Sequence, residues 1–200
     1  MLEAYLFVDP LCKQCIKSEK IIKRLAKNLN THFLYQFIPM LNIKILNNTR
    51  VPKMARIHQQ LYYQIVMDYK AALFHGKKRG QNFFITLQEE LLNDKDRYNN
   101  RLVLATAENS KLDLDMFKED RRSQLAKKSF EADQQLVHEM KITKPSSAVI
   151  FNWAMFNYGI LFNNVNYDDL YRVCHSQPER INRKSIRDNH GIPVPHVSIN

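Results

Sequence analysis

Two cysteines three residues apart, Cys12 and Cys15, are the residues of this chain whose type and spacing most directly suggest chemistry. They lie in the stretch VDPLCKQCIKSE, between an apolar run and a lysine-rich segment. A Cys-x-x-Cys pair can exchange disulfides, can supply half of a metal site, or can be two small apolar fillers of a core. The local sequence alone is compatible with all three interpretations.

The segments around this pair predict where it lies in the fold. Residues 2–8 are apolar on both faces, as in a buried parallel strand. Residues 12–29 have a helical period, with lysines opposite the apolar face, and residues 31–40 are again strand-like. Strand, helix and strand predict a βαβ unit with parallel strands and a right-handed crossover. Cys12 then lies at the carboxyl edge of the sheet, where α/β proteins place their chemistry.

A long helical region is expected to interrupt the sheet. Between about residues 51 and 140 the strand signal is absent and apolar residues recur at helical spacing. Asp133, in the last of these helices, is expected to face outward. Asn99 or Asn100, and Asp113 or Asp115, are expected to cap two of the helices. One apolar stripe, expected to pack mostly inward, consists of Ile57, Leu61, Ile65 and Tyr69.

The strand pattern returns after the helical region. Residues 146–153 and 158–165 are separated by a short connection with a glycine, which predicts an antiparallel hairpin. A closing helix is expected from Tyr167 to about His175. The remaining residues are polar, basic and proline-bearing, so they are expected to form a tail.

This order of elements, with Cys-x-x-Cys opening the first helix, resembles the thioredoxin fold in its DsbA form. The fold class is therefore expected to be α/β, with a large helical insertion between a βαβ half and a β-hairpin half. The expected thioredoxin-like domain comprises residues 1–48 and 125–176. The inserted helical domain is expected at 49–124, and the tail at 177–200.

Three stretches carry a closer resemblance: LEAYLFVDPLC, QFIPMLN and DYKAALFHGKKRGQNFFITLQ. They resemble a cytoplasmic DsbA-like dithiol family of Gram-positive bacteria. Its members include the Clp-protease adaptor that delivers the Spx stress regulator, and others described as dithiol–disulfide isomerases. The resemblance thus implies two functions: thiol–disulfide exchange in the cytosol, or, as the alternative, non-enzymatic delivery of a regulator to a Clp AAA+ protease.

The candidate site for exchange is built around the two thiols. At the start of the helix, unpaired backbone N–H groups and the helix dipole stabilise a thiolate at Cys12, and Lys13 adds a cation. Cys15 is placed to resolve a mixed disulfide.

The resemblance adds a proline that enters the strand after the helical region. In the stretch KITKPSSAVIF, Pro145 occupies this place, which implies a cis Lys144–Pro145 bond. Lys144 would offer backbone groups to an extended substrate, and Leu11 stands where thioredoxins commonly have an aromatic residue before the nucleophile. Leu11, Lys13 and Lys144 are the candidate substrate-binding residues.

A metal site is not expected. Zinc would need two further ligands, and the remaining pair is Cys174 and His175 at the far end of the chain, without a second Cys-x-x-Cys. Cys174 is expected in the core. No cofactor is expected either.

Composition limits the partners. The 200 residues carry a net charge of +10, but the charge is scattered and not interleaved with aromatic residues, so nucleic acid is not expected as a partner. The charge suits acidic protein clients. The first ten residues do not resemble a signal peptide, and no apolar run approaches the roughly 18–20 residues of a membrane span. The expected location is therefore the cytoplasm.

Overall fold

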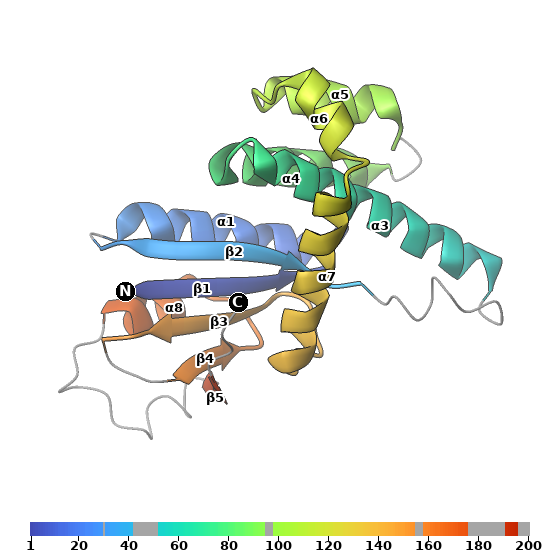
Figure 1. Ribbon diagram of the computed structural model, residues 1–200. Helices are drawn as coiled ribbons and strands as arrows, with labels where there is room; N and C mark the ends of the chain where they lie inside the picture. The colour runs from blue at the N-terminus through green and yellow to red at the C-terminus, as the bar shows by residue number, and fades with distance from the viewer. Residues whose placement is uncertain (30, 42–51, 95–97, 155–157, 176–190, 196–200) are drawn as a thin grey trace. The chain divides into compact units, whose positions relative to one another are not determined.

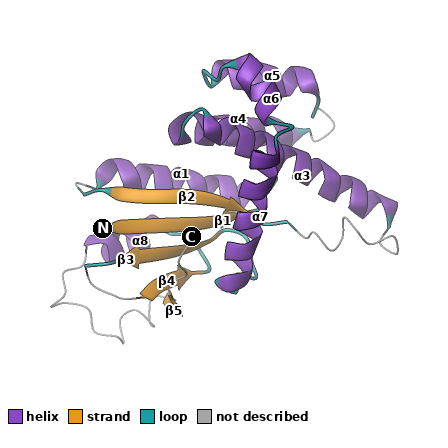
Figure 2. Ribbon diagram, viewed as in Figure 1, coloured by secondary structure: helices purple, strands orange, loops and turns teal. Residues whose placement is uncertain are grey.

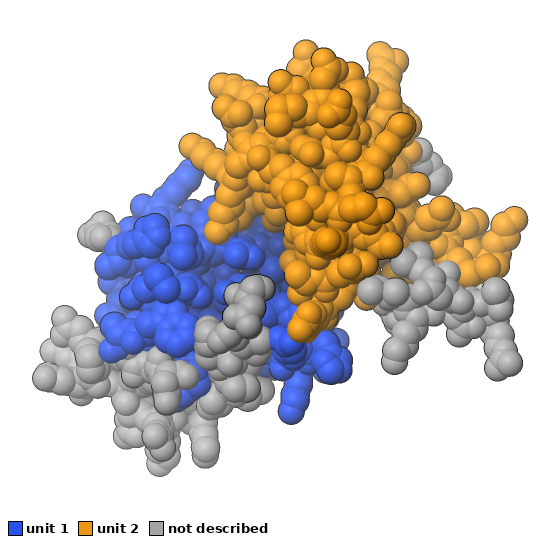
Figure 3. All heavy atoms as spheres, in the orientation of Figure 1, with its two compact units in different colours: residues 1–8, 14–38, 136–200 blue, residues 9–13, 39–135 orange. Residues whose placement is uncertain are grey.

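The chain divides into two units, one built on a sheet and the other made of helices. The computed structural model describes residues 1–29, 31–41, 52–94, 98–154, 158–175 and 191–195. The first unit comprises residues 1–8, 14–38 and 136–200, and the second comprises residues 9–13 and 39–135 (Figure 3). The division of elements between sheet and helix is shown in Figure 2.

The sheet of the first unit has the strand order β2-β1-β3-β4-β5. Figure 1 shows β1 and β2 running in the same direction, as a βαβ unit requires. β1 pairs antiparallel with β3, with Ala4 opposite Ile150, and β3 pairs antiparallel with β4. The predicted parallel pair and the predicted hairpin are both confirmed. The strands are β1 (Leu2–Val8), β2 (Phe33–Pro39), β3 (Ser147–Asn152), β4 (Tyr158–Phe162) and β5 (Gly191–Pro195).

Helix α1 (Lys13–Asn28) connects β1 to β2 and follows its amphipathic pattern. Its buried face includes Cys15, Ile22 and Leu25, whereas its lysines lie on the other faces. The closing helix α8 (Tyr167–His175) was predicted with the same bounds. The Asn152 side chain at the end of β3 donates a hydrogen bond of 3.1 Å to the carbonyl of Val173 in α8. An apolar face in α1 and a hydrogen bond from the Asn152 side chain to α8 therefore hold these helices to the sheet.

The fifth strand lies in the segment that the sequence predicts as a tail. β5 pairs antiparallel with β4, with Pro193 opposite Ile160 and Pro195 opposite Tyr158. Proline has no N–H to donate, so it is tolerated at the outer strand of a sheet. The sheet thus gains an edge that a side-chain pattern does not reveal. The rest of the predicted tail, residues 177–190 and 196–200, lies outside the described residues.

The second unit consists of helices, as the sequence predicts. Figure 1 shows α3 and α4 in succession, followed by the shorter α5 and α6. Among the described residues, no helix has the length and hydropathy needed to cross a bilayer. The helices are α3 (Lys53–Phe74), α4 (Lys77–Asn93), α5 (Asn100–Asn109), α6 (Leu114–Asp120) and α7 (Gln124–Glu139), of which the last four residues belong to the first unit.

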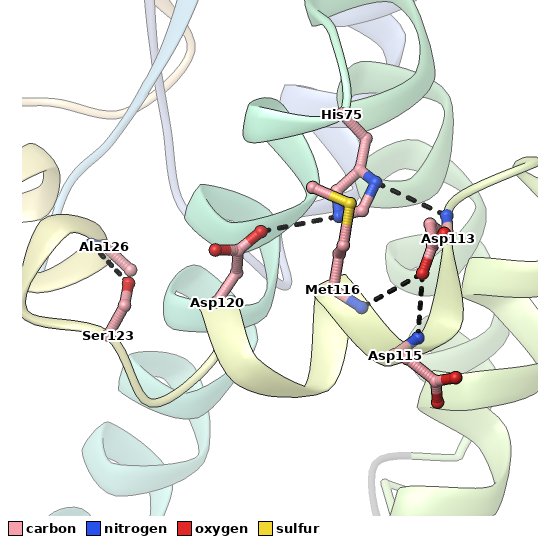
Figure 4. Close-up of polar contacts among 7 residues, drawn as sticks. All are labelled: His75, Asp113, Asp115, Met116, Asp120, Ser123 and Ala126. Atoms are coloured by element: carbon pink, nitrogen blue, oxygen red, sulfur yellow. Dashed lines mark hydrogen bonds and ion pairs between the residues drawn. The ribbon is translucent and has the colours of Figure 1, made fainter.

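Helix α6 begins at the predicted cap. The Asp113 carboxylate accepts hydrogen bonds of 3.0 Å from the N–H groups of Asp115 and Met116 (Figure 4). The Asp113 N–H in turn donates to Nδ1 of His75 at 3.4 Å, and His75 Nε2 lies 3.5 Å from the Asp120 carboxylate. His75, which directly follows α3, therefore contacts both ends of this short helix. At α5 the prediction of a cap at Asn99 or Asn100 is also confirmed, because Asn99 caps this helix.

The apolar stripe of α3 packs inward only in its second half. Ile65 is fully buried and Tyr69 nearly so, with the Tyr69 ring stacked on Phe84 at a centroid distance of 4.2 Å. Ile57, by contrast, is 48% exposed, so the expectation that the stripe packs inward is wrong at this position. The helical period continues through the first half of α3, so periodicity alone does not show that Ile57 is exposed there.

The junction of α3 and α4 depends on a glycine. A Cβ atom at Gly80 would lie 2.8 Å from both the Cα and the N atoms of Leu73, which are backbone atoms and cannot move aside. Gly80→Ala is therefore expected to reduce the free energy of unfolding by about 1–3 kcal/mol. Urea unfolding measures this, with the exposed Lys78→Ala in the same helix expected to stay within about 0.5 kcal/mol of wild type. Equal effects of the two substitutions would refute the close-packing explanation.

A buried ion pair lies inside the second unit. Lys70 of α3 and Asp133 of α7 are 4% and 7% exposed, and the Lys70 ammonium contacts the Asp133 carboxylate. The expectation that Asp133 faces outward is wrong. Its partner is far away in sequence, and periodicity alone cannot show that a lysine of another helix supplies the compensating charge.

Candidate functional site

A four-residue turn carries the chain from β1 into α1 and presents Cys12. The Cys12 N–H donates to the carbonyl of Asp9 at 3.3 Å, and the Leu11 N–H donates to the Asp9 carboxylate at 2.9 Å. Pro10 occupies the second position of this turn, where its fixed φ is favourable. Because α1 begins at Lys13, Cys12 is the residue directly before the helix.

The two thiols differ in accessibility. Cys12 is partly exposed, whereas Cys15, in the first turn of α1, is fully buried. The first N–H groups of a helix have no partner within the helix and favour an anion at its start. This arrangement suits Cys12 as the attacking thiolate and Cys15 as the resolving thiol. The structure holds both as thiols, and exchange would interconvert this form with the disulfide.

The remaining cysteine is placed as expected. Cys174 is 9% exposed in α8, and burial raises the pKa of its thiol to about 12. A thiol of this pKa is protonated at neutral pH and is a poor nucleophile. Among the described residues, no group of three or more His, Cys, Asp or Glu side chains is arranged to hold a metal ion.

The turn at Pro145 differs from the expectation. The described residues contain no cis peptide bond, so the Lys144–Pro145 bond is trans and the expected cis isomer is wrong. Ser146 instead adopts a φ of 62°, in the left-handed region, and its N–H donates to the carbonyl of Phe7 at 2.7 Å. The chain thus enters β3 through a reversal at Ser146.

A buried hydrogen bond joins this turn to α1. The hydroxyl groups of Ser18 and Ser146 are 2.8 Å apart, and Ser18 is fully buried three residues after Cys15. The turn that contains Pro145 therefore lies against the helix that contains Cys15. Pro145 itself is exposed.

The three candidate substrate-binding residues lie in different environments. Leu11 is 8% exposed and packs into the interior, while Lys13 is exposed at the first position of α1. Lys144 is also exposed, but its carbonyl already accepts a hydrogen bond of 2.9 Å from the Ser147 hydroxyl. Their contact with a substrate stays a prediction.

Two residues near the dithiol were missed by the sequence analysis. Ser18 and Glu19 are both fully buried in α1, although serine and glutamate are normally exposed. Their spacing of three and four residues from Cys15 places them on the face of the helix that carries this thiol. That spacing is the signal that could have identified them.

Comparison with known proteins identifies the family. A family model described as thioredoxin matches residues 5–173. The ClpXP adapter protein SpxH of Bacillus subtilis strain 168 is 29% identical over an alignment of 175 positions, and the match covers 76% of this chain and 58% of that protein. SpxH of Bacillus cereus is 30% identical over an alignment of 211 positions, and the match covers 89% of this chain and 71% of that protein. The chain thus spans less than two thirds of the B. subtilis relative.

The fold has a counterpart among solved structures. The crystal structure of the oxidoreductase DsbA from Xylella fastidiosa matches with a TM-score of 0.57 and 11% identity, covering 86% of this chain and 81% of that one. At this identity the likeness concerns the fold, which has a helical insertion between β2 and β3 here as predicted. The chain therefore belongs to the thioredoxin family, in its DsbA-like form, together with the SpxH adapter proteins.

Proposed function

We propose that the chain is a cytoplasmic adaptor, which binds a regulator of the Spx type and promotes its degradation by a Clp AAA+ protease. The observation that carries this proposal is the similarity to SpxH of Bacillus cereus, 30% identical and covering 71% of that protein. An adaptor needs surfaces for two partners and makes or breaks no covalent bond. Cys12 and Cys15 are therefore dispensable for this function.

Exposed apolar side chains of the second unit support a role in protein binding. Met54 and Ile57 in the first half of α3 are 65% and 48% exposed. Met116 of α6 and Leu125 of α7 are 57% and 61% exposed. A partner that covers such side chains would gain apolar contact area. The net charge of +10 would accelerate association with an acidic client.

Binding to purified partners tests the adaptor function. Titration calorimetry of the wild-type chain with an Spx-type regulator, and separately with ClpX, is expected to show saturable binding to each. Gel filtration of all three is expected to show them eluting together. Absence of binding to either partner would reject the proposal.

A second function, thiol–disulfide exchange, is favoured by the position of Cys12 at the start of α1 with Cys15 buried behind it. The Cys12 thiolate attacks a client disulfide, forming a mixed disulfide and releasing one client sulfur as thiolate. The Cys15 thiolate then attacks Cys12 Sγ and releases the second client sulfur. The client gains two electrons, and the Cys12–Cys15 pair becomes a disulfide.

This cycle needs a proton acceptor and a reductant. Glu19, which is buried one helical turn after Cys15, is the candidate to take the Cys15 proton as the thiolate forms. A low-molecular-weight thiol must reduce the Cys12–Cys15 disulfide to complete the cycle. Reduction of insulin in the presence of glutathione tests this function, and failure of the wild-type chain to accelerate it would reject it.

A further inference from the structure

An open depression of about 950 Å³ lies in the helical unit, among α3, α5, α6 and α7. All of its lining residues belong to the second unit. The side chains that matter for recognition are Tyr63, Met67, Lys118, Arg121, Arg122 and Lys127. Neither Cys12 nor Cys15 is among its lining residues.

One wall of the depression is fixed by a network around Asp68. The Asp68 carboxylate accepts hydrogen bonds from Arg121 Nε at 2.5 Å, from Arg121 Nη2 at 3.4 Å, and from the Tyr98 hydroxyl at 2.8 Å. Arg121 Nη1 also donates to Asn100 at 2.7 Å. The charges of Asp68 and Arg121 therefore cancel, and α3, α5 and α6 are held together before any ligand arrives.

The rim of the depression is cationic. Lys118, Arg122 and Lys127 are exposed, and the carboxylates among the lining residues are those of Asp68, which is paired with Arg121, and Glu119. Within the described part of the chain, no carboxylate forms an ion pair with Arg122 or Lys127. Lys118 contacts Asp115 at 3.0 Å, but both side chains are strongly exposed, and such pairs contribute little. Three cations are thus available to an anionic ligand.

The α3 side of the depression offers apolar contact. Tyr63 and Met67 are half-buried, and the Tyr63 ring is held edge-on to Phe130 at a centroid distance of 5.5 Å. The apolar α3 side and the cationic rim together suit a peptide in which acidic and apolar side chains alternate.

We propose that this depression binds an acidic segment of the protein client, with carboxylates on Arg122 and Lys127 and an apolar side chain against Tyr63 and Met67. This inference rests on the proposed adaptor function and places one client contact within it. Like other contacts between exposed charges, it would act chiefly on the association rate and on specificity.

The test is fluorescence anisotropy of the full chain with a short labelled peptide of alternating glutamate and leucine. Arg122→Glu/Lys127→Glu is expected to weaken binding by at least about ten-fold. The matched control, Arg101→Glu/Lys128→Glu, has the same change in net charge at exposed positions outside the depression. The affinity of this control for the peptide is expected to stay within about two-fold of the wild-type affinity, a difference that the change in net charge would explain.

Three results of the binding measurements would overturn the inference. One is equal loss of binding in both double variants, because net charge alone would then explain it. The others are absence of peptide binding to wild type, and tight binding of pyrophosphate that the peptide does not displace.

Degradation of the regulator by ClpXP separates this inference from the proposed function. If wild type supports degradation and Arg122→Glu/Lys127→Glu does so equally, the adaptor function stands and the docking site fails. If wild type binds the peptide but supports no degradation, the site stands and the adaptor function fails.

Discussion

Lys70→Met is expected to reduce the free energy of unfolding by about 3–5 kcal/mol at about pH 8. The substitution keeps the length of the side chain but leaves the Asp133 carboxylate buried without its cation. Both side chains are nearly inaccessible to water, so solvent cannot replace the lost partner. Chemical denaturation monitored by circular dichroism measures the loss.

The loss should shrink on acidification. Burial raises the pKa of Asp133 to about 6 even though Lys70 opposes the shift, so removal of Lys70 raises it further. A carboxyl group whose pKa is higher in the folded than in the unfolded chain binds its proton preferentially in the folded chain. The free energy of unfolding of the variant therefore increases as the pH falls through this raised pKa.

A double variant is the control for this prediction. In Lys70→Met/Asp133→Leu both charges are absent, and stability is expected within about 1.5 kcal/mol of wild type at about pH 8. If Lys70→Met costs less than about 1 kcal/mol, or if its cost does not change with pH, the buried pair does not have the role described here.

Cys12→Ser is expected to abolish acceleration of insulin reduction, leaving the uncatalysed rate. A serine hydroxyl cannot form the mixed disulfide, so the first step of exchange is lost. Cys15→Ser should still form that mixed disulfide but not resolve it, and mass spectrometry should detect the trapped adduct.

Cys174→Ser is the matched control, because the Cys174 thiol is buried and its raised pKa keeps it protonated. The rate of insulin reduction by Cys174→Ser is expected to be within about two-fold of the wild-type rate. Exchange that persists in Cys12→Ser would assign the chemistry to another thiol and refute the roles given to Cys12 and Cys15.

Much of the first unit could be predicted from sequence because its signals are local. The change of period after Val8 defines β1 and α1, and so locates Cys12 at their junction. The caps of α5 and α6 were also visible, since a capping side chain bonds N–H groups only two or three positions away.

Features that depend on distant partners could not be predicted. Asp133 was expected to face outward because a carboxylate is rarely buried, and its cation comes from another helix. β5 pairs through its backbone, so its polar, proline-bearing sequence does not show the strand. The turn at Pro145 is stabilised by Phe7 and Ser18, and neither contact can be read from the sequence near it.

Degradation of an Spx-type regulator by purified ClpXP is the most direct test of the adaptor function. The wild-type chain is expected to accelerate degradation, and Cys12→Ser/Cys15→Ser is expected to accelerate it equally, because delivery requires binding surfaces and no thiol chemistry. Failure of the wild-type chain to accelerate degradation, with both partners active, would contradict the proposed function. Loss of acceleration in the cysteine variant alone would contradict its independence of the dithiol.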